Sequence, residues 1–386
     1  MQTKFWQRKE ATICVSIALA ISFYFLSNFP VATSVSDFFY DADTPRTLNY
    51  LNDPTSAFSS LRPFLVAIAS IGYLFNIVVS TYFAWCILNF FSIVGLGWSF
   101  NRYTNRSLSG AQIVLLLSAN YSVLCWLATP DTFVLAIAMF SIAIVIYGEG
   151  HRKSRVVFSG IIASSLNLFL LFPWLVTHLF IGRKKLRRTL SETSLVILVT
   201  SLASASAQLL TKENYQSDLP PMLADKSAVS FTSIFPFYGS EGLFGKVSVL
   251  QWIHFPWEGV QENLLSFLSA PWMPSYKYDI TNLPSGSERF PVIALLLAIS
   301  LSCLSFYGLF ASRRRYRTVF VFCLSLEITV LILFVTYSTH PFLFSPFLIL
   351  PRLFGIVMLT NSQKGKFYLL AFVSMMATII SLQLAR

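Results

Sequence analysis

The stretch Arg152–Arg188, RKSRVVFSGIIASSLNLFLLFPWLVTHLFIGRKKLRR, indicates the fold class of this chain. Its apolar run, residues 156–182, is bounded on both sides by lysines and arginines. Basic residues gather on the cytoplasmic side of membrane proteins, so both clusters should lie on that side. Two full crossings need about 40 residues, because each needs about 20 to cross the hydrocarbon layer. The run has only 27, which predicts a hairpin of two short or broken helices with its turn between Asn167 and Trp174.

The composition extends this prediction to the whole chain. Of its 386 residues, 55% are hydrophobic and only 12% are charged, and apolar runs near 20 residues recur throughout. We therefore expect residues 1–386 to form a single transmembrane domain, an all-α polytopic helix bundle of about eleven spans if the hairpin counts as two. The net charge of +11 lies mainly in clusters between the spans, which reports topology and indicates no nucleic-acid partner. These clusters are Lys4/Arg8/Lys9, Arg102/Arg106, Arg152/Lys153/Arg155, Arg183/Lys184/Lys185/Arg187/Arg188, Arg313/Arg314/Arg315/Arg317 and Lys364/Lys366.

The clusters set a topology with a cytoplasmic amino terminus and two sizeable outer segments. Residues 30–62 form the first outer loop and residues 211–289 form the large one, while 63–77 is an interfacial or re-entrant piece. The expected spans, besides the hairpin, are 11–29, 78–99, 109–128, 132–148, 190–210, 290–311, 318–338, 342–360 and 367–385.

The large outer segment contains short apolar pieces and several tryptophans. The pieces Val247–Phe255 and Leu264–Leu268 are expected to lie on the membrane face as amphipathic helices. Its tryptophans, Trp272 among them, are either interfacial anchors or part of a lid that stacks on a substrate.

Carboxylates at the outer mouth of the bundle are the first functional candidates. Asp41 and Asp43 lie in YDADTPR (Tyr40–Arg46) of the first outer loop, and Asp131 lies in a short outer turn after Pro130. They are either solvated loop charges or chemically active groups. Asp131 also suits the N-cap of the following helix, a role compatible with a functional one.

Two charges lie near the middle of apolar runs, where an unpaired charge is costly. Glu327 and Arg352 either form an ion pair with each other, or Arg352 reaches outward to hold a phosphate. His340 lies in the outer turn between these runs and is either incidental or part of a substrate site.

Taken together, these features resemble the GT-C superfamily of membrane glycosyltransferases, in its branch of protein O-mannosyltransferases and aminoarabinose transferases. The resemblance covers about the first 210 residues. It rests on the broken helices of 156–182 and on three motifs, YDADTPR (Tyr40–Arg46), LRPFL (Leu61–Leu65) and TPDTF (Thr129–Phe133).

The resemblance implies an inverting sugar transfer from a polyprenyl-phosphate donor to an acceptor on the extracytoplasmic face of a bacterial inner membrane. Asp41, Asp43 and Asp131 are then the catalytic candidates, with Asp41 or Asp43 activating the acceptor. The leaving phosphate and the substrate are expected to contact Arg46, Arg62, Arg352 and His340. No cofactor is required; a divalent metal, if one binds, would be Mg²⁺ or Mn²⁺ between Asp43 and Asp131.

Two alternatives stay open: a transporter or flippase for a lipid-linked saccharide, and a non-catalytic membrane assembly subunit. By the expected topology 13 carboxylates lie outside and only Glu10, Glu149 and Glu192 inside, which favours outer-face chemistry over a two-sided passage. The sequence has no Walker A loop, GxGxxG or GxSxG, so nucleotide-driven transport and a hydrolase elbow lack support. Its five cysteines indicate neither a disulfide framework nor a zinc site.

Overall fold

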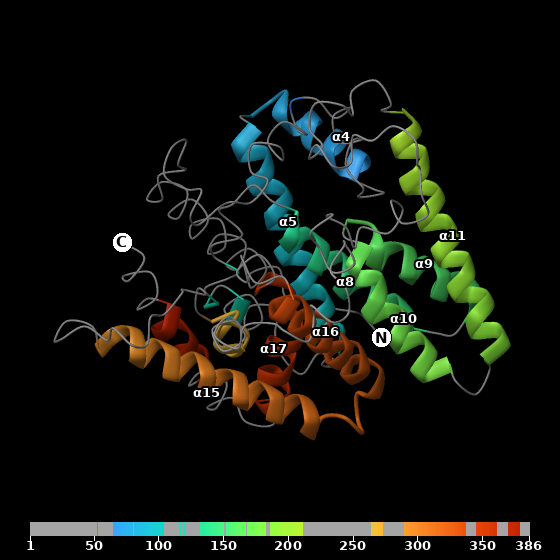
Figure 1. The fold of residues 1–386 in the computed structure, drawn as a ribbon. Coiled ribbons are helices and arrows are strands. Elements are labelled where there is room, and N and C mark those ends of the chain that lie inside the picture. Colours follow the sequence, from blue (N-terminus) through green and yellow to red (C-terminus); the bar gives the residue numbers. More distant parts are fainter. Residues whose placement is uncertain are drawn as a thin grey trace, which may run out of the picture. The chain divides into compact units, whose positions relative to one another are not determined.

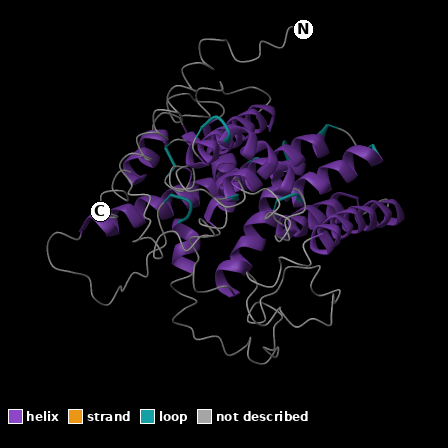
Figure 2. Cartoon of the chain, turned by 90° about the horizontal axis from the view of Figure 1, so that it is seen from above, coloured by secondary structure: helices purple, strands orange, loops and turns teal. Residues whose placement is uncertain are grey.

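Every regular element that the structure describes is a helix (Figure 2). It is a computed structural model, and it describes residues 52, 65–79, 81–103, 116–117, 119–120, 123, 132–149, 152–166, 168–182, 186–210, 264–272, 289–336, 345–360 and 370–378. The all-α prediction is therefore confirmed for this part of the chain.

The helices begin and end close to the expected boundaries (Figure 1). Their bounds are α4 Leu65–Asn76, α5 Thr81–Tyr103, α8 Phe133–Gly148, α9 Lys153–Ser164, α10 Leu171–Gly182, α11 Leu186–Leu210, α15 Arg289–Ala311, α16 Arg317–Thr336 and α17 Ser345–Thr360, with a 3₁₀ turn η2 at Leu168–Leu170. The predicted pair of short helices in 156–182 is confirmed as α9 and α10, joined through η2. The stretch 63–100 likewise contains two helices, α4 and α5, rather than one.

Membrane-spanning character is clear for one helix of the described part. Residues Val292–Ala311 of α15 form the one described helix that is both long and apolar enough to cross a membrane. Three further apolar helices are shorter, over Phe133–Gly148, Leu171–Ile181 and Pro346–Leu359. A membrane location is thus supported in outline, while eleven spans stay a prediction.

The chain divides into two compact units. One consists of Met1–Ala42, Asn89–Thr129 and Trp257–Arg386, and the other of Asp43–Leu88 and Pro130–Pro256. We describe each unit by itself; the single transmembrane domain expected from the sequence stays a prediction.

In the second unit, α8 is the central helix. Most of its side chains are buried, on all sides of the helix, as expected for a helix that is apolar all round. The short helix α9 packs against α8 and α11, and it comes closest to α11 at Gly160. A Cβ at Gly160 would lie 2.8 Å from the Val196 methyl groups and 2.9 Å from the Trp174 ring. A glycine is therefore required for this close approach.

In the first unit, α17 packs against α15 and α16. Two glycines face each other across the α15–α17 contact: a Cβ at Gly308 would collide with the Gly355 carbonyl oxygen, and one at Gly355 with the Ser305 carbonyl oxygen. At the same crossing the Ser305 hydroxyl donates a hydrogen bond to the Arg352 carbonyl oxygen at 2.6 Å. The backbones of the two helices are thus in direct contact, an arrangement typical of small residues at membrane helix crossings.

The glycine contact gives a first testable expectation. Gly355→Ala should destabilise the protein by about 1 to 3 kcal/mol, because the new methyl group meets backbone that cannot rotate away. Gly148→Ala is the matched control, since a Cβ there would have no neighbour within 4 Å. The thermal unfolding midpoint of both variants in detergent checks this. Equal midpoints would mean that α15 and α17 do not meet at Gly355.

The large outer segment departs from its prediction at its described residues. A short helix does cover residues 264–269, but Phe267 and Trp272 are buried within the protein. The interfacial placement expected for this piece is therefore wrong, and Trp272 is neither a membrane anchor nor an exposed lid residue. Local apolar content could not distinguish burial in lipid from burial in protein. The piece Val247–Phe255 lies outside the described residues.

Candidate functional site

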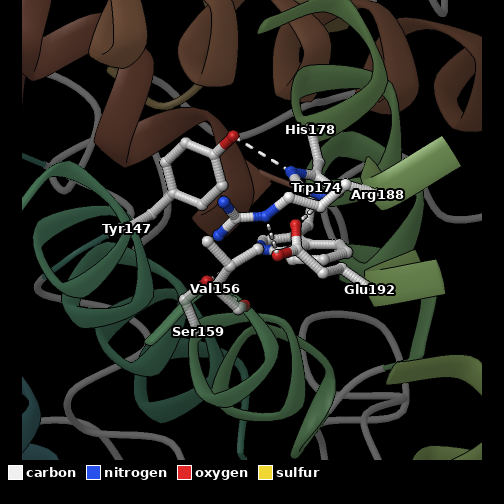
Figure 3. Close-up of polar contacts among 7 residues, drawn as sticks. All are labelled: Tyr147, Val156, Ser159, Trp174, His178, Arg188 and Glu192. Carbon is white, nitrogen blue, oxygen red and sulfur yellow. Dashed lines mark hydrogen bonds and ion pairs between the residues drawn. The ribbon is translucent and has the colours of Figure 1, made fainter. Parts of the chain in front are cut away.

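Four polar side chains form a chain of contacts inside the second unit (Figure 3). The Tyr147 hydroxyl and His178 Nδ1 are 3.0 Å apart, and His178 Nε2 lies 3.3 Å from Glu192 Oε2, an ion-pair distance. Arg188 Nε donates a hydrogen bond to Glu192 Oε1 at 2.8 Å. Tyr147, His178 and Glu192 are buried, whereas Arg188 keeps 44% of its side chain exposed. We call these four residues the Tyr147–Arg188 cluster.

An indole ring forms one side of this cluster. Trp174 stacks on the His178 imidazole, with ring centroids 5.0 Å apart and planes 28° from parallel. Its Nε1 donates a hydrogen bond to Ser159 Oγ at 3.0 Å, and the Ser159 hydroxyl donates to the Val156 carbonyl oxygen at 2.7 Å. These bonds join α10 to α9 and explain how polar groups are accommodated within the apolar hairpin.

The cluster brings together the same end of four helices. Tyr147 lies in the last turn of α8, and His178 lies in the last two turns of α10. Arg188 and Glu192 occupy adjacent turns at the start of α11, at the i, i+4 spacing that suits an ion pair. Arg155 at the start of α9 donates a hydrogen bond to the Glu149 carbonyl oxygen at 2.8 Å, just beyond α8. The two basic clusters that flank the hairpin therefore adjoin one end of the second unit.

The arrangement serves cohesion and offers a site for a proton. His178 can bond to Tyr147 through one ring nitrogen while it contacts Glu192 through the other, whichever tautomer it adopts. Glu192 would be a costly buried anion alone, but it contacts both Arg188 and His178. Its carboxylate thus joins α10 to α11.

We expect the cluster to stabilise the fold in proportion to the bonds removed. His178→Leu should cost about 1 to 3 kcal/mol, because Tyr147 and Glu192 each lose a buried contact. Tyr147→Phe should cost only about 0.5 to 1.5 kcal/mol. Thermal unfolding in detergent gives the comparison, with Tyr307→Phe as the control because Tyr307 is 68% exposed. If His178→Leu unfolds no earlier than this control, the contacts do not stabilise the protein.

A second buried charge site lies in the first unit, between the middles of α16 and α17. Arg352 Nε is 2.6 Å from Glu327 Oε1, and Arg352 Nη2 donates a hydrogen bond to Glu327 Oε2 at 3.1 Å. The guanidinium carbon also lies 4.2 Å from the Phe306 ring centroid and 5.0 Å from that of Phe267. Both charged side chains are buried. The pair is bidentate and shielded by aromatic rings, a favourable geometry for a charge pair within apolar helices.

Of the residues singled out from the sequence, the structure describes Glu327 and Arg352. The ion-pair alternative for these two is confirmed, and whether Arg352 also contacts a phosphate stays a prediction. The remaining candidates lie outside the described residues: Asp41, Asp43, Arg46, Arg62, Asp131 and His340. Among the residues that are described, no group of three or more His, Cys, Asp and Glu side chains converges as a metal site would require. The suggested metal site of Asp43 and Asp131 is therefore not tested.

Sequence reasoning did not find the Tyr147–Arg188 cluster. One signal was available: His178 is an ionisable residue within an apolar run, and Glu192 is one of only three carboxylates on the expected cytoplasmic side. Ionisable groups in such positions usually pair. Tyr147 and Trp174 gave no such signal, because aromatic residues are common in membrane helices.

Comparisons with known proteins identify no relative. No family model matches the chain, and neither the curated proteins nor the solved structures include a match.

Proposed function

We propose that this chain is an integral-membrane glycosyltransferase of about eleven spans, a GT-C-type enzyme of a bacterial inner membrane. It moves a sugar from a polyprenyl-phosphate donor to an acceptor on the extracytoplasmic face. The proposal rests on the outer carboxylate motifs of the sequence and on the topology that puts them outside.

The distribution of polar and apolar side chains supports a membrane environment. Large apolar residues are exposed along several helices, such as Leu202 on α11 and Leu296 on α15. Ionic and hydroxyl groups are instead inside, as Glu192, Glu327 and Ser302 illustrate. Extended apolar surface is unusual on a monomeric protein in water, whereas lipid solvates it.

The observation that carries the proposal is the shared end of α8, α9, α10 and α11 at the Tyr147–Arg188 cluster. This arrangement supports the assignment of both flanking basic clusters to the cytoplasmic side. Helix α8 has 16 residues and is about 24 Å long, so its first turn lies far from Tyr147. Asp131 precedes that first turn in the sequence, which supports an outer location for it.

The proposed chemistry uses a carboxylate and cations at the outer face. Asp43, or Asp41 beside it, accepts the proton of the acceptor hydroxyl or amine as that atom attacks the anomeric carbon. The bond from the sugar to the lipid phosphate breaks, and the phosphate leaves as an anion near Arg46 and Arg62. Arg352 is assigned no phosphate contact, because its guanidinium is buried against Glu327.

Reconstitution tests the activity directly. Liposomes containing the purified full-length protein receive radiolabelled polyprenyl-phosphate sugars and a mixture of membrane glycans and lipids as acceptors. We expect label to move from the lipid phosphate to an acceptor. If no donor in a panel of sugars is consumed, the glycosyltransferase proposal is wrong.

The topology has its own test. In a background without the native cysteines, Asp43→Cys and Asp131→Cys should react with a membrane-impermeant maleimide added outside intact spheroplasts. Arg155→Cys is the control and should react only after lysis, since Arg155 belongs to a basic cluster and is exposed. Labelling of position 43 or 131 from the cytoplasmic side alone would refute the outer-face site.

A transporter or flippase for a lipid-linked saccharide is the second candidate. The buried Glu327–Arg352 pair favours it, because charges within apolar helices often line substrate or ion pathways. The same liposomes separate the two candidates. A flippase would move labelled donor between leaflets without breaking the sugar-phosphate bond, whereas the transferase would consume the donor.

A further inference from the structure

An open pocket of about 530 Å³ lies at the start of α11. Its lining among the described residues consists of Leu186, Arg187, Arg188 and Ser191. Two guanidinium groups and a hydroxyl thus border a space large enough for a phosphate headgroup. The only acidic residue of α11, Glu192, is buried next to Arg188 and does not line the pocket.

The same face of α11 continues below the pocket as an apolar stripe. Arg187, Ser191, Leu195, Leu198 and Leu202 follow one another at intervals of three or four residues, so they share one side of the helix. The leucines are exposed, Leu198 at 54% and Leu202 at 59%. From Ser191 to Leu202 the helix rises about 16 Å, close to the roughly 15 Å hydrocarbon depth of one leaflet.

The opposite face of α11 fixes this orientation. Thr189, Glu192, Val196 and Thr200 are buried, and the Thr200 hydroxyl lies 3.3 Å from the Ser164 hydroxyl of α9. Val196 packs on Gly160, where no side chain can intervene. The helix therefore cannot turn its arginines and leucines inward without breaking these contacts.

We propose that this face of α11 is a binding site for one anionic phospholipid of the cytoplasmic leaflet. Arg187, Arg188 and Ser191 hold the headgroup phosphate, and Leu195, Leu198 and Leu202 contact an acyl chain. The inference rests on the membrane location in the proposed function, and it is independent of glycosyl transfer.

Charge and shape together select this ligand. The segment 183–188 carries five basic residues and no acidic one, and such segments next to a membrane helix attract anionic lipids. A guanidinium group suits a phosphate because it can donate two parallel hydrogen bonds. A free phosphate would satisfy the arginines but would leave the leucine stripe unused, whereas a phospholipid contacts both.

Native mass spectrometry of the full-length protein in neutral detergent tests the site, with phosphatidylglycerol as the probe and phosphatidylcholine as the uncharged comparison. We expect one phosphatidylglycerol to be retained in preference to phosphatidylcholine. Arg187→Gln should weaken this binding about fivefold, the loss typical of one basic residue at a membrane surface. Leu198→Asn together with Leu202→Asn should also weaken it, although the charge is unchanged.

Matched controls make the result decisive. Arg314→Gln removes an exposed arginine from the turn between α15 and α16 and should leave binding unchanged. Arg188→Gln is compared only after its unfolding midpoint is measured, because Arg188 also contacts Glu192. Equal retention of both lipids, or wild-type binding by Arg187→Gln, would overturn the proposal. Displacement of the lipid by millimolar inorganic phosphate would identify a site for free anions instead. Each of these outcomes leaves the sugar-transfer assay unaffected.

Discussion

Asp43→Asn should lower the rate of sugar transfer in liposomes about 10²- to 10⁴-fold, the usual contribution of a general base. Asparagine keeps the shape of the side chain but cannot take the proton of the attacking acceptor. The donor should still bind, so the loss should fall on kcat, while the KM for the lipid-linked sugar changes little. The measurement is the initial rate of label transfer over a range of donor concentrations.

Two further variants locate the base within the motif. Asp53→Asn is the control, since Asp53 lies in the same expected outer loop but outside YDADTPR, and it should transfer at the wild-type rate. If Asp41→Asn loses more activity than Asp43→Asn, Asp41 is the base. Transfer by both variants at wild-type rates would leave the motif without a catalytic role and would favour the assembly-subunit alternative.

The helices themselves could be predicted from the sequence because two simple patterns coincide. Apolar runs define where a helix can be buried, and basic clusters define where it ends. For α8, α11, α15 and α16 the observed bounds lie within four residues of the expected ones. The α9–α10 hairpin was predictable for the same reason, since 27 residues between two clusters on the same side leave room for no other arrangement.

Contacts between distant residues were predictable only where burial demands a partner. Glu327 and Arg352 are opposite charges in the middle of apolar helices, and leaving either unpaired is costly. No comparable requirement links Tyr147 to His178, or Trp174 to Ser159, because these neutral groups can be satisfied in several ways. Their partners depend on how α8, α9 and α10 pack, which a pattern along one helix does not encode.

Arg352→Met should be among the most destabilising substitutions in the protein, by about 3 to 5 kcal/mol, because it leaves the Glu327 carboxylate buried without its counter-ion. Glu327→Leu should be similarly harmful, since it leaves the guanidinium with only the rings of Phe306 and Phe267 beside it. Arg313→Met is the control, because it removes an exposed arginine from the turn after α15. The unfolding midpoint in detergent is the measurement for each variant.

The double variant Glu327→Leu/Arg352→Met distinguishes a structural pair from a working one. A buried pair replaced by apolar side chains of similar size often costs little, because the desolvation penalty of both charges disappears with them. We therefore expect the double variant to regain most of the stability that either single variant loses, a coupling that a double-mutant cycle measures directly. If it also transfers sugar at the wild-type rate, the pair only holds α16 to α17. A stable double variant that neither transfers nor moves the lipid-linked sugar would instead show that these charges act on the substrate, which would contradict the assignment of Arg352 to packing alone.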